Sequence, residues 1–95
     1  MAYVLIHHAV DRYEEFEAVF TADEGRRRRM GSLGGSVFRD LEDPGDVFIV
    51  LEWADVDRAK KFAAGYELQE AMKWATSGAD RPQVWVVEKS LEAGA

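Results

Sequence analysis

Three short segments of the chain carry apolar residues at consecutive positions, which predicts β-strands with two apolar faces. They are residues 3–10, 47–53 and 83–89, and they are rich in β-branched and aromatic residues. A strand with one solvated face alternates apolar and polar side chains instead. A fourth strand is predicted from Ser36 to Leu41. The Pro44-Gly45 pair then indicates a tight turn, so this strand and the one at 47–53 should form an antiparallel hairpin.

Apolar residues at helical spacing predict one helix from Asp11 to about Met30. Asp11 and Glu14 have the spacing of a capping box, in which two side chains satisfy the free amide groups at a helix start. Gly31 is expected to end this helix, because glycine readily adopts the left-handed conformation of a helix terminus. The aromatic residues on one face of the helix are Tyr13, Phe16 and Phe20.

A second helical region follows the third strand. A short helix is predicted to begin at Asp55 or Asp57 and to be interrupted at Gly65. A further helix is predicted after Gly65 and before Pro82. Its apolar stripe at i, i+3, i+4 and i+7 consists of Leu68, Ala71, Met72 and Ala75.

The order of these elements is strand, helix, strand, strand, helix pair, strand. It is typical of the split βαβ arrangement of ferredoxin-like α+β folds, with a four-stranded antiparallel sheet and helices on one face. Ninety-five residues fit a single domain, so we expect one over residues 1–95, with a frayed tail from about residue 90.

The helices can cover only one face of this sheet, although both faces are apolar. Alternation along the first strand places Ile6 and His8 under the helices and Tyr3, Leu5 and His7 on the opposite face. Burying roughly six to eight side chains against a second copy contributes on the order of 10 kcal/mol before the costs of association. We therefore expect a homodimer formed through the sheet face. The alternative is that loops or the tail cover this face.

Composition excludes several classes of function. The net charge is −6, from 18 acidic and 12 basic residues, which argues against nucleic-acid binding and against anionic membrane surfaces. The chain has no cysteine, so thiolate chemistry and disulfides are excluded. No apolar run approaches the roughly 20 residues of a membrane span, and the first residues do not resemble a secretory leader. We expect a cytoplasmic protein.

Five stretches of the chain resemble a known family when they are taken together. They are residues 3–11 (YVLIHHAVD), 34–39 (GGSVFR), 50–53 (VLEW), 59–62 (AKKF) and 68–72 (LQEAM). Over about residues 3–89 the chain resembles the dimeric α/β-barrel superfamily, and within it the antibiotic-biosynthesis-monooxygenase-like branch. The resemblance implies a dimer with a ligand pocket between the sheet and the helices of each subunit. It does not select one activity, because the superfamily holds cofactor-free quinone-forming oxygenases, haem-degrading oxygenases and polyketide cyclases.

Haem degradation is disfavoured by the residues at the corresponding positions. The haem-degrading members carry an Asn on the first strand and a Trp and a His in the second helical region. Those places correspond here to Ile6 or His8, Phe62 and Met72, so the axial His is missing. The Asn, Trp and Tyr of the aromatic-ring oxygenases have no residue-by-residue match either. We expect no cofactor.

His8 is the candidate catalytic residue. An imidazole titrates near neutral pH, so on the helix-covered face it can take a proton from a phenol or an activated carbon. The alternative is a hydrogen-bonded histidine of the core or the sheet edge. His7 and His8 face opposite sides of their strand, so they cannot share a metal ion, and no metal site is expected.

The candidate substrate-binding residues are mainly aromatic. They are Phe62, Tyr66, Met72 and Trp74, to which Trp53 and Trp85 can add, and Trp74 is the least well explained by core packing. Such side chains can line a pocket for a flat aromatic ligand, although ordinary packing is the common use of aromatic residues.

Two arginine features each allow more than one interpretation. Arg39 is a candidate for binding a substrate carboxylate or enolate, and a salt bridge to Glu52 across the hairpin or plain exposure is the alternative. The run from Arg26 to Arg29 lies at a predicted helix end. It is interpreted as a solvated face that complements the helix dipole.

The function that these features favour is a cofactor-free oxygenase acting on a small aromatic or polyketide-like compound. The alternatives are a polyketide-cyclase-like enzyme, which needs no oxygen, and a non-catalytic dimeric module that binds a small apolar molecule.

Overall fold

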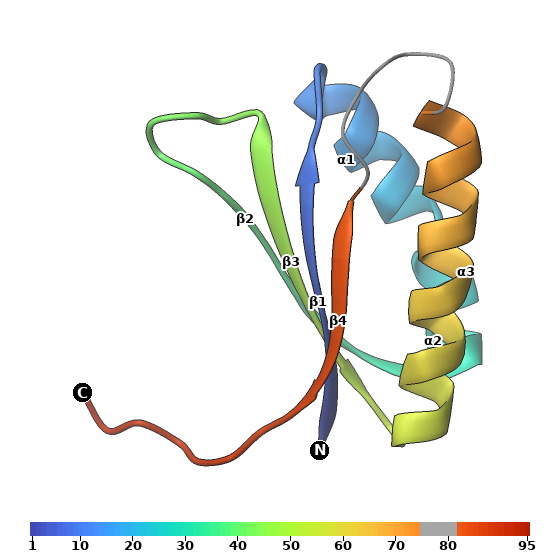
Figure 1. Cartoon of the computed structure of the whole chain (residues 1–95), viewed down its shortest axis with the longest axis vertical. Coiled ribbons are helices and arrows are strands. Elements are labelled where there is room, and N and C mark those ends of the chain that lie inside the picture. The colour runs from blue at the N-terminus through green and yellow to red at the C-terminus, as the bar shows by residue number, and fades with distance from the viewer. Residues whose placement is uncertain (75–81) are drawn as a thin grey trace.

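Four antiparallel strands are covered on one face by helices (Figure 1). The computed structural model describes residues 1–74 and 82–95, with side chains for residues 1–66 and 82–95. The sheet order is β2-β3-β1-β4, which confirms the predicted ferredoxin-like split βαβ fold. The elements in chain order are β1 (Ala2–Ala9), α1 (Tyr13–Ala22), α2 (Glu24–Met30), β2 (Ser32–Arg39), β3 (Asp46–Trp53), α3 (Val56–Trp74) and β4 (Gln83–Glu88).

The core lies between the sheet and α3. Alternate residues of β1 and β3 point toward the helices and are buried, and the register places Ile6 opposite Ile49. From α3, Ala59, Phe62 and Ala63 pack against them. The largest fully buried side chains are those of Trp53, Ile6, Ile49, Val4 and Val47. Aliphatic side chains of this kind contribute about 1.5–3 kcal/mol each when buried, so this layer is the main source of stability.

The first helical region departs from its prediction at two places. The prediction of a capping box at Asp11 and Glu14 is wrong, because α1 begins at Tyr13. Its N-cap residue, Arg12, makes no side-chain cap hydrogen bond. The sheet holds the chain extended beyond β1, since the Val10 amide donates to the Gly45 carbonyl at 2.8 Å. The prediction of a single helix is also wrong, because the helical region breaks at Asp23 into α1 and α2. The predicted end is confirmed, with Gly31 at a φ of 114°.

The second helical region is one helix where a pair was predicted. Asp55 caps it, because its carboxylate accepts a hydrogen bond from the Arg58 amide at 2.8 Å. The interruption at Gly65 is wrong, since α3 continues through this residue to Trp74. Packing of one helix face on the sheet outweighs the weak helix propensity of a single glycine. The predicted apolar stripe of Leu68, Ala71, Met72 and Ala75 lies outside the described side chains.

Strand β2 begins at Ser32, four residues before its predicted start. Its two glycines are part of the strand. Gly34 has a φ of 110° and lies where the pairing register between β2 and β3 shifts. A Cβ on Gly35 would lie 1.8 Å from the Val50 carbonyl oxygen. At Gly35 the backbones of β2 and β3 therefore come too close for a side chain.

The sheet face away from the helices is apolar and exposed. Its exposed fractions are 54% for Phe38, 41% for Phe48, 47% for Trp85 and 36% for Val87. The C-terminal tail leaves β4 toward the open side and runs away from the molecule (Figure 1). We call Phe38, Phe48, Trp85 and Val87, together with Tyr3, Leu5, His7 and Val50, the open sheet face.

Over the described residues, no helix is long and apolar enough to cross a bilayer.

Candidate functional site

A cavity of about 880 Å³ opens between α1, α2, the end of β1 and the middle of α3. Its lining is apolar on the inside and charged toward the helix break at Asp23. The described lining residues are His8, Val10, Asp11, Arg12, Glu15, Phe16, Val19, Phe20, Ala22, Asp23, Arg26, Arg27, Phe62 and Tyr66. Apolar walls with a few polar groups are typical of sites for small organic molecules.

His8 lies in the floor of this cavity. Its side chain points toward the helices because alternate residues of β1 do so, and only 2% of its surface is exposed. Its Nδ1 lies 3.1 Å from the Tyr66 hydroxyl oxygen, within hydrogen-bond distance. The edges of two rings hold the imidazole: Phe16 at 6.3 Å and Tyr66 at 6.2 Å, both at an interplanar angle of 87°. The result is an imidazole held in a fixed orientation.

Aromatic rings form the walls on both sides of His8. On α1, Phe16 stacks on Phe20 with ring centres 5.6 Å apart. On α3, Phe62 lies 5.9 Å from Tyr66. Because flat rings pack well against aromatic faces and edges, this arrangement suits a planar aromatic ligand.

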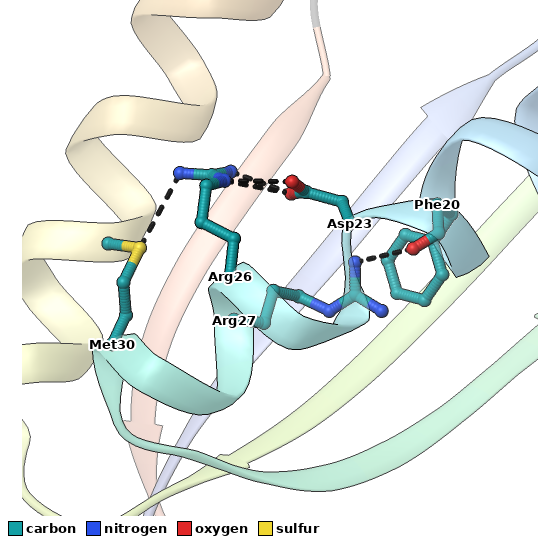
Figure 2. A network of polar contacts seen from close by, with 5 residues as sticks. All are labelled: Phe20, Asp23, Arg26, Arg27 and Met30. Atoms are coloured by element: carbon teal, nitrogen blue, oxygen red, sulfur yellow. Dashed lines mark hydrogen bonds and ion pairs between the residues drawn. The ribbon is translucent and has the colours of Figure 1, made fainter.

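An ion pair at the helix break faces the same cavity (Figure 2). The guanidinium of Arg26 donates three hydrogen bonds to the Asp23 carboxylate, at 2.8, 2.8 and 3.1 Å. Hydrogen bonding from Arg26 lowers the pKa of Asp23, and the same contact raises the pKa of Arg26. Each of these two charges is therefore largely neutralised by the other.

Arg27 differs from its neighbours in the arginine run. Only 7% of it is exposed, its Nη1 donates to the Phe20 carbonyl at 2.7 Å, and its guanidinium carbon lies 3.7 Å above the Phe20 ring. The interpretation of the whole run as a solvated face is wrong for this residue. The break between α1 and α2 turns it inward, and the sequence pattern of one continuous helix does not predict that break.

The predicted site residues are distributed unequally. His8, Phe62 and Tyr66 come together around the cavity. Trp53 is fully buried in the core, and Trp85 lies on the open sheet face, so neither of them lines the cavity. The side chains of Met72 and Trp74 lie outside the described residues.

Arg39 does not lie at the cavity. Its Nε donates to the Pro44 carbonyl at 3.0 Å, and its guanidinium carbon lies 3.9 Å above the Tyr13 ring. The alternative prediction, a salt bridge from Arg39 to Glu52, is also wrong. Glu52 of β3 pairs with Gly34, near the end of β2 that is far from Arg39. Arg39 holds the hairpin against α1.

Sequence reasoning missed Phe16, Phe20 and Arg27 as cavity residues. The two phenylalanines were assigned to the apolar face of the helix, which is also the face that borders the cavity. The seven-residue spacing from Phe20 is no signal for Arg27, because it sets a shared face only in an unbroken helix and the two residues lie on either side of the break at Asp23. Within the described residues, no group of three or more His, Asp or Glu side chains is placed to hold a metal ion.

Comparison with known proteins shows similarity to solved structures. The chain resembles a protein assigned as an antibiotic biosynthesis monooxygenase from Bordetella bronchiseptica, with a TM-score of 0.69, 25% identity and coverage of 95% of this chain and 97% of that chain. It also resembles SnoaB, a cofactor-independent oxygenase from Streptomyces nogalater, with a TM-score of 0.67, 16% identity and coverage of 99% and 96%.

A third similar structure is that of a mutant of MhuD, a haem degrader from Mycobacterium tuberculosis, with two manganese protoporphyrin IX groups bound per active site. The TM-score is 0.67 at 18% identity, and each chain is covered in full. No family model and no curated protein matches the sequence.

Proposed function

Because the chain has the fold of the antibiotic-biosynthesis-monooxygenase-like branch of the dimeric α/β-barrel superfamily, we propose that it is a cofactor-independent oxygenase of a small aromatic compound. The observation that supports this most is the His8–Tyr66 pair, with its 3.1 Å contact, in the floor of an aromatic-walled cavity. Fold similarity by itself does not assign an activity, so the proposal depends on this site.

His8 is proposed as the base. A phenolic or anthrone-type substrate stacks between the α1 and α3 rings and gives a proton to the imidazole, with Tyr66 orienting the ring. The resulting carbanion has the electrons to reduce O₂. A C–O bond then forms and the O–O bond breaks. Oxidation of a CH₂ group to a carbonyl supplies four electrons, so one oxygen atom enters the product and the other leaves as water.

Haem chemistry receives no support from the residues that the structure describes. Among them, the only imidazole lining the cavity is that of His8, and its Nδ1 lies against the Tyr66 hydroxyl. An iron would therefore have to use the same imidazole that contacts Tyr66. The proposed reaction therefore does not involve haem.

A homodimer through the open sheet face is part of the proposal. Phe38, Phe48, Trp85 and Val87 expose aromatic and aliphatic side chains on one continuous face of adjacent strands. His7 stacks on Phe48 with ring centres 4.7 Å apart, so the two rings form one apolar surface across β1 and β3. Contiguous apolar patches of this kind mark sites of association. The cavity opens on the opposite side, so each subunit keeps its own site.

The test of the oxygenase is oxygen uptake with anthrone as substrate, corrected for spontaneous oxidation. We expect His8→Ala to lower kcat by about a hundredfold or more, because a positioned general base is removed. His7→Ala is the matched control. It removes an imidazole from the opposite face and should leave kcat unchanged.

Equal turnover by His8→Ala and the wild type would show that the proposed base is wrong. Product formation without oxygen would identify an aldol-type cyclase instead. Saturable quenching of tryptophan fluorescence by the ligand, with no product under any condition, would identify a binding module.

A further inference from the structure

Arg27 is a buried cation in the wall of the cavity, and the proposed oxygenase reaction does not use it. Only 7% of its surface is exposed, whereas Arg28 and Arg29 on the same helix are exposed. Figure 2 shows its guanidinium against the Phe20 ring, with one dashed contact to the Phe20 carbonyl oxygen. This hydrogen bond is 2.7 Å long, and the stacking distance is 3.7 Å.

The acidic groups near Arg27 are engaged by other arginines. Asp23 accepts three hydrogen bonds from Arg26, and Glu24 lies 3.6 Å from Arg28. Among the residues that the structure describes, no carboxylate lies within ion-pair distance of Arg27. Burial lowers the pKa of Arg27, but a guanidinium remains protonated throughout the physiological range. A buried cation without an ionic partner is costly unless something else supplies the negative charge.

The geometry of Arg27 suits an anionic oxygen. A guanidinium has five N–H donors in a planar fork, and within the described part of the chain one hydrogen bond is formed, through Nη1. Stacking on Phe20 fixes the plane of the fork, so little conformational entropy is lost when a ligand binds. The guanidinium borders the same cavity as His8 and Tyr66. A carboxylate can accept two parallel hydrogen bonds from such a fork.

We propose that the cavity takes a planar aromatic molecule that carries a carboxylate, and that Arg27 binds this carboxylate while the aromatic walls hold the ring. The proposal concerns the same cavity as the proposed oxygenase and narrows the class of its substrate. The chain has a net charge of −6, so its overall field does not attract anions. A preference for an anionic ligand must therefore come from a local group.

The test uses two probes of nearly the same shape, 2-naphthoate and its uncharged amide, 2-naphthamide. Their affinities are measured by titration calorimetry with the full chain. We expect the wild type to bind 2-naphthoate about tenfold or more tightly than 2-naphthamide, as is typical of a charge-assisted hydrogen bond. In Arg27→Met this preference should disappear, while the affinity for 2-naphthamide should change little.

Arg28→Met is the matched control, because it removes the same charge from an exposed position of the same helix. It should retain the preference for the anion. Arg27→Lys, which keeps the charge and loses the fork, should retain part of it. If Arg27→Met loses the circular-dichroism spectrum of the folded protein, Arg27→Gln is measured in its place, and the same loss of preference is expected.

Three results would overturn the proposal: no binding of either probe to the wild type, no preference for 2-naphthoate, or an equal loss of preference in Arg27→Met and Arg28→Met. The experiment needs no turnover, so its outcome is separate from that of the oxygenase. A protein that binds 2-naphthoate through Arg27 but consumes no oxygen with any substrate would contradict the oxygenase alone.

Discussion

The Tyr66 hydroxyl, on α3, lies 3.1 Å from Nδ1 of His8, on β1, across 58 positions of the sequence. The contact links the sheet to the helix that covers it, and it fixes the orientation of the one imidazole found in the cavity among the described residues. When the imidazole proton is on Nε2, the hydroxyl donates to Nδ1. When the proton is on Nδ1, the hydroxyl oxygen accepts a hydrogen bond from Nδ1.

The Tyr66→Phe variant tests this contact. It removes one oxygen atom and keeps the ring contacts to His8 and Phe62. We expect kcat for anthrone oxidation to fall about tenfold and the pH profile of kcat to shift, because the imidazole loses its partner. Unfolding free energy should fall by only about 1 kcal/mol.

Tyr13→Phe is the control, since Tyr13 packs on Phe16 but does not line the cavity. It should leave both kcat and its pH profile unchanged. A pH profile of Tyr66→Phe that superimposes on that of the wild type would exclude any effect of the hydroxyl on the imidazole.

The homodimer is tested by a charge on the open sheet face. Phe48→Glu places a carboxylate on that face, between Phe38 and His7, where burial without a partner costs several kcal/mol. We expect sedimentation velocity in the micromolar range to show a dimer for the wild type and a monomer for Phe48→Glu. Leu41→Glu makes the same chemical change at a fully exposed turn residue and should remain a dimer. A monomeric wild type would refute the interface.

The ion pair of Asp23 and Arg26 makes stability depend on pH in a defined direction. Arg26 lowers the folded-state pKa of Asp23 below its unfolded value of about 3.9. The stabilisation is therefore fully present above about pH 4, and it is lost as the pH falls through the lowered, folded-state pKa. The two side chains are 37% and 42% exposed, so screening limits the effect to about 1 kcal/mol or less.

Urea unfolding of Asp23→Asn and of the wild type measures this effect. Asp23→Asn should be the less stable protein at pH 7, and the difference should shrink toward zero at pH 2. Glu24→Gln breaks the longer, more exposed pair with Arg28 and should show a smaller difference at pH 7. A difference for Asp23→Asn that is the same at both pH values would contradict the electrostatic explanation.

Two glycines should respond in opposite ways to the same substitution. Gly35→Ala puts a methyl group 1.8 Å from the Val50 carbonyl oxygen, so the backbones of β2 and β3 must separate. We expect a loss of about 2 to 4 kcal/mol in unfolding free energy. At Gly65, inside α3, a Cβ meets no described atom within 4 Å outside the backbone of its own helix. Gly65→Ala should therefore stabilise the protein by about 0.5 to 1 kcal/mol. Thermal unfolding of both variants distinguishes these effects, and equal signs would refute the argument.

The strand segments and their faces could be predicted from the sequence. Alternation along β1 places His8 under the helices and His7 on the open face, because successive side chains of a strand point to opposite sides. The β2–β3 hairpin and the end of α2 at Gly31 also followed from local chemistry, since Pro44 and Gly45 favour a turn and glycine readily adopts the positive φ of a helix end. The residues next to each other in the sequence are therefore sufficient to predict these features.

Features that depend on distant contacts could not be predicted. The glycines at 34 and 35 have the composition of a loop, yet the close approach of β3 requires them inside a strand. Gly65 has the character of a helix interruption, but packing of α3 on the sheet carries the helix through it. In both cases tertiary packing energy exceeds the local preference.

By itself, the sequence determined β1, β3 and β4, the apolar character of both sheet faces and the place of His8, because each depends on a short periodic pattern. Only the tertiary structure decided which residues share the cavity. The break at Asp23 turns Arg27 inward, and the β1–α3 crossing brings Tyr66 to His8. A site made from segments far apart in the chain is set by how those segments pack, and packing is not encoded in any single stretch of residues.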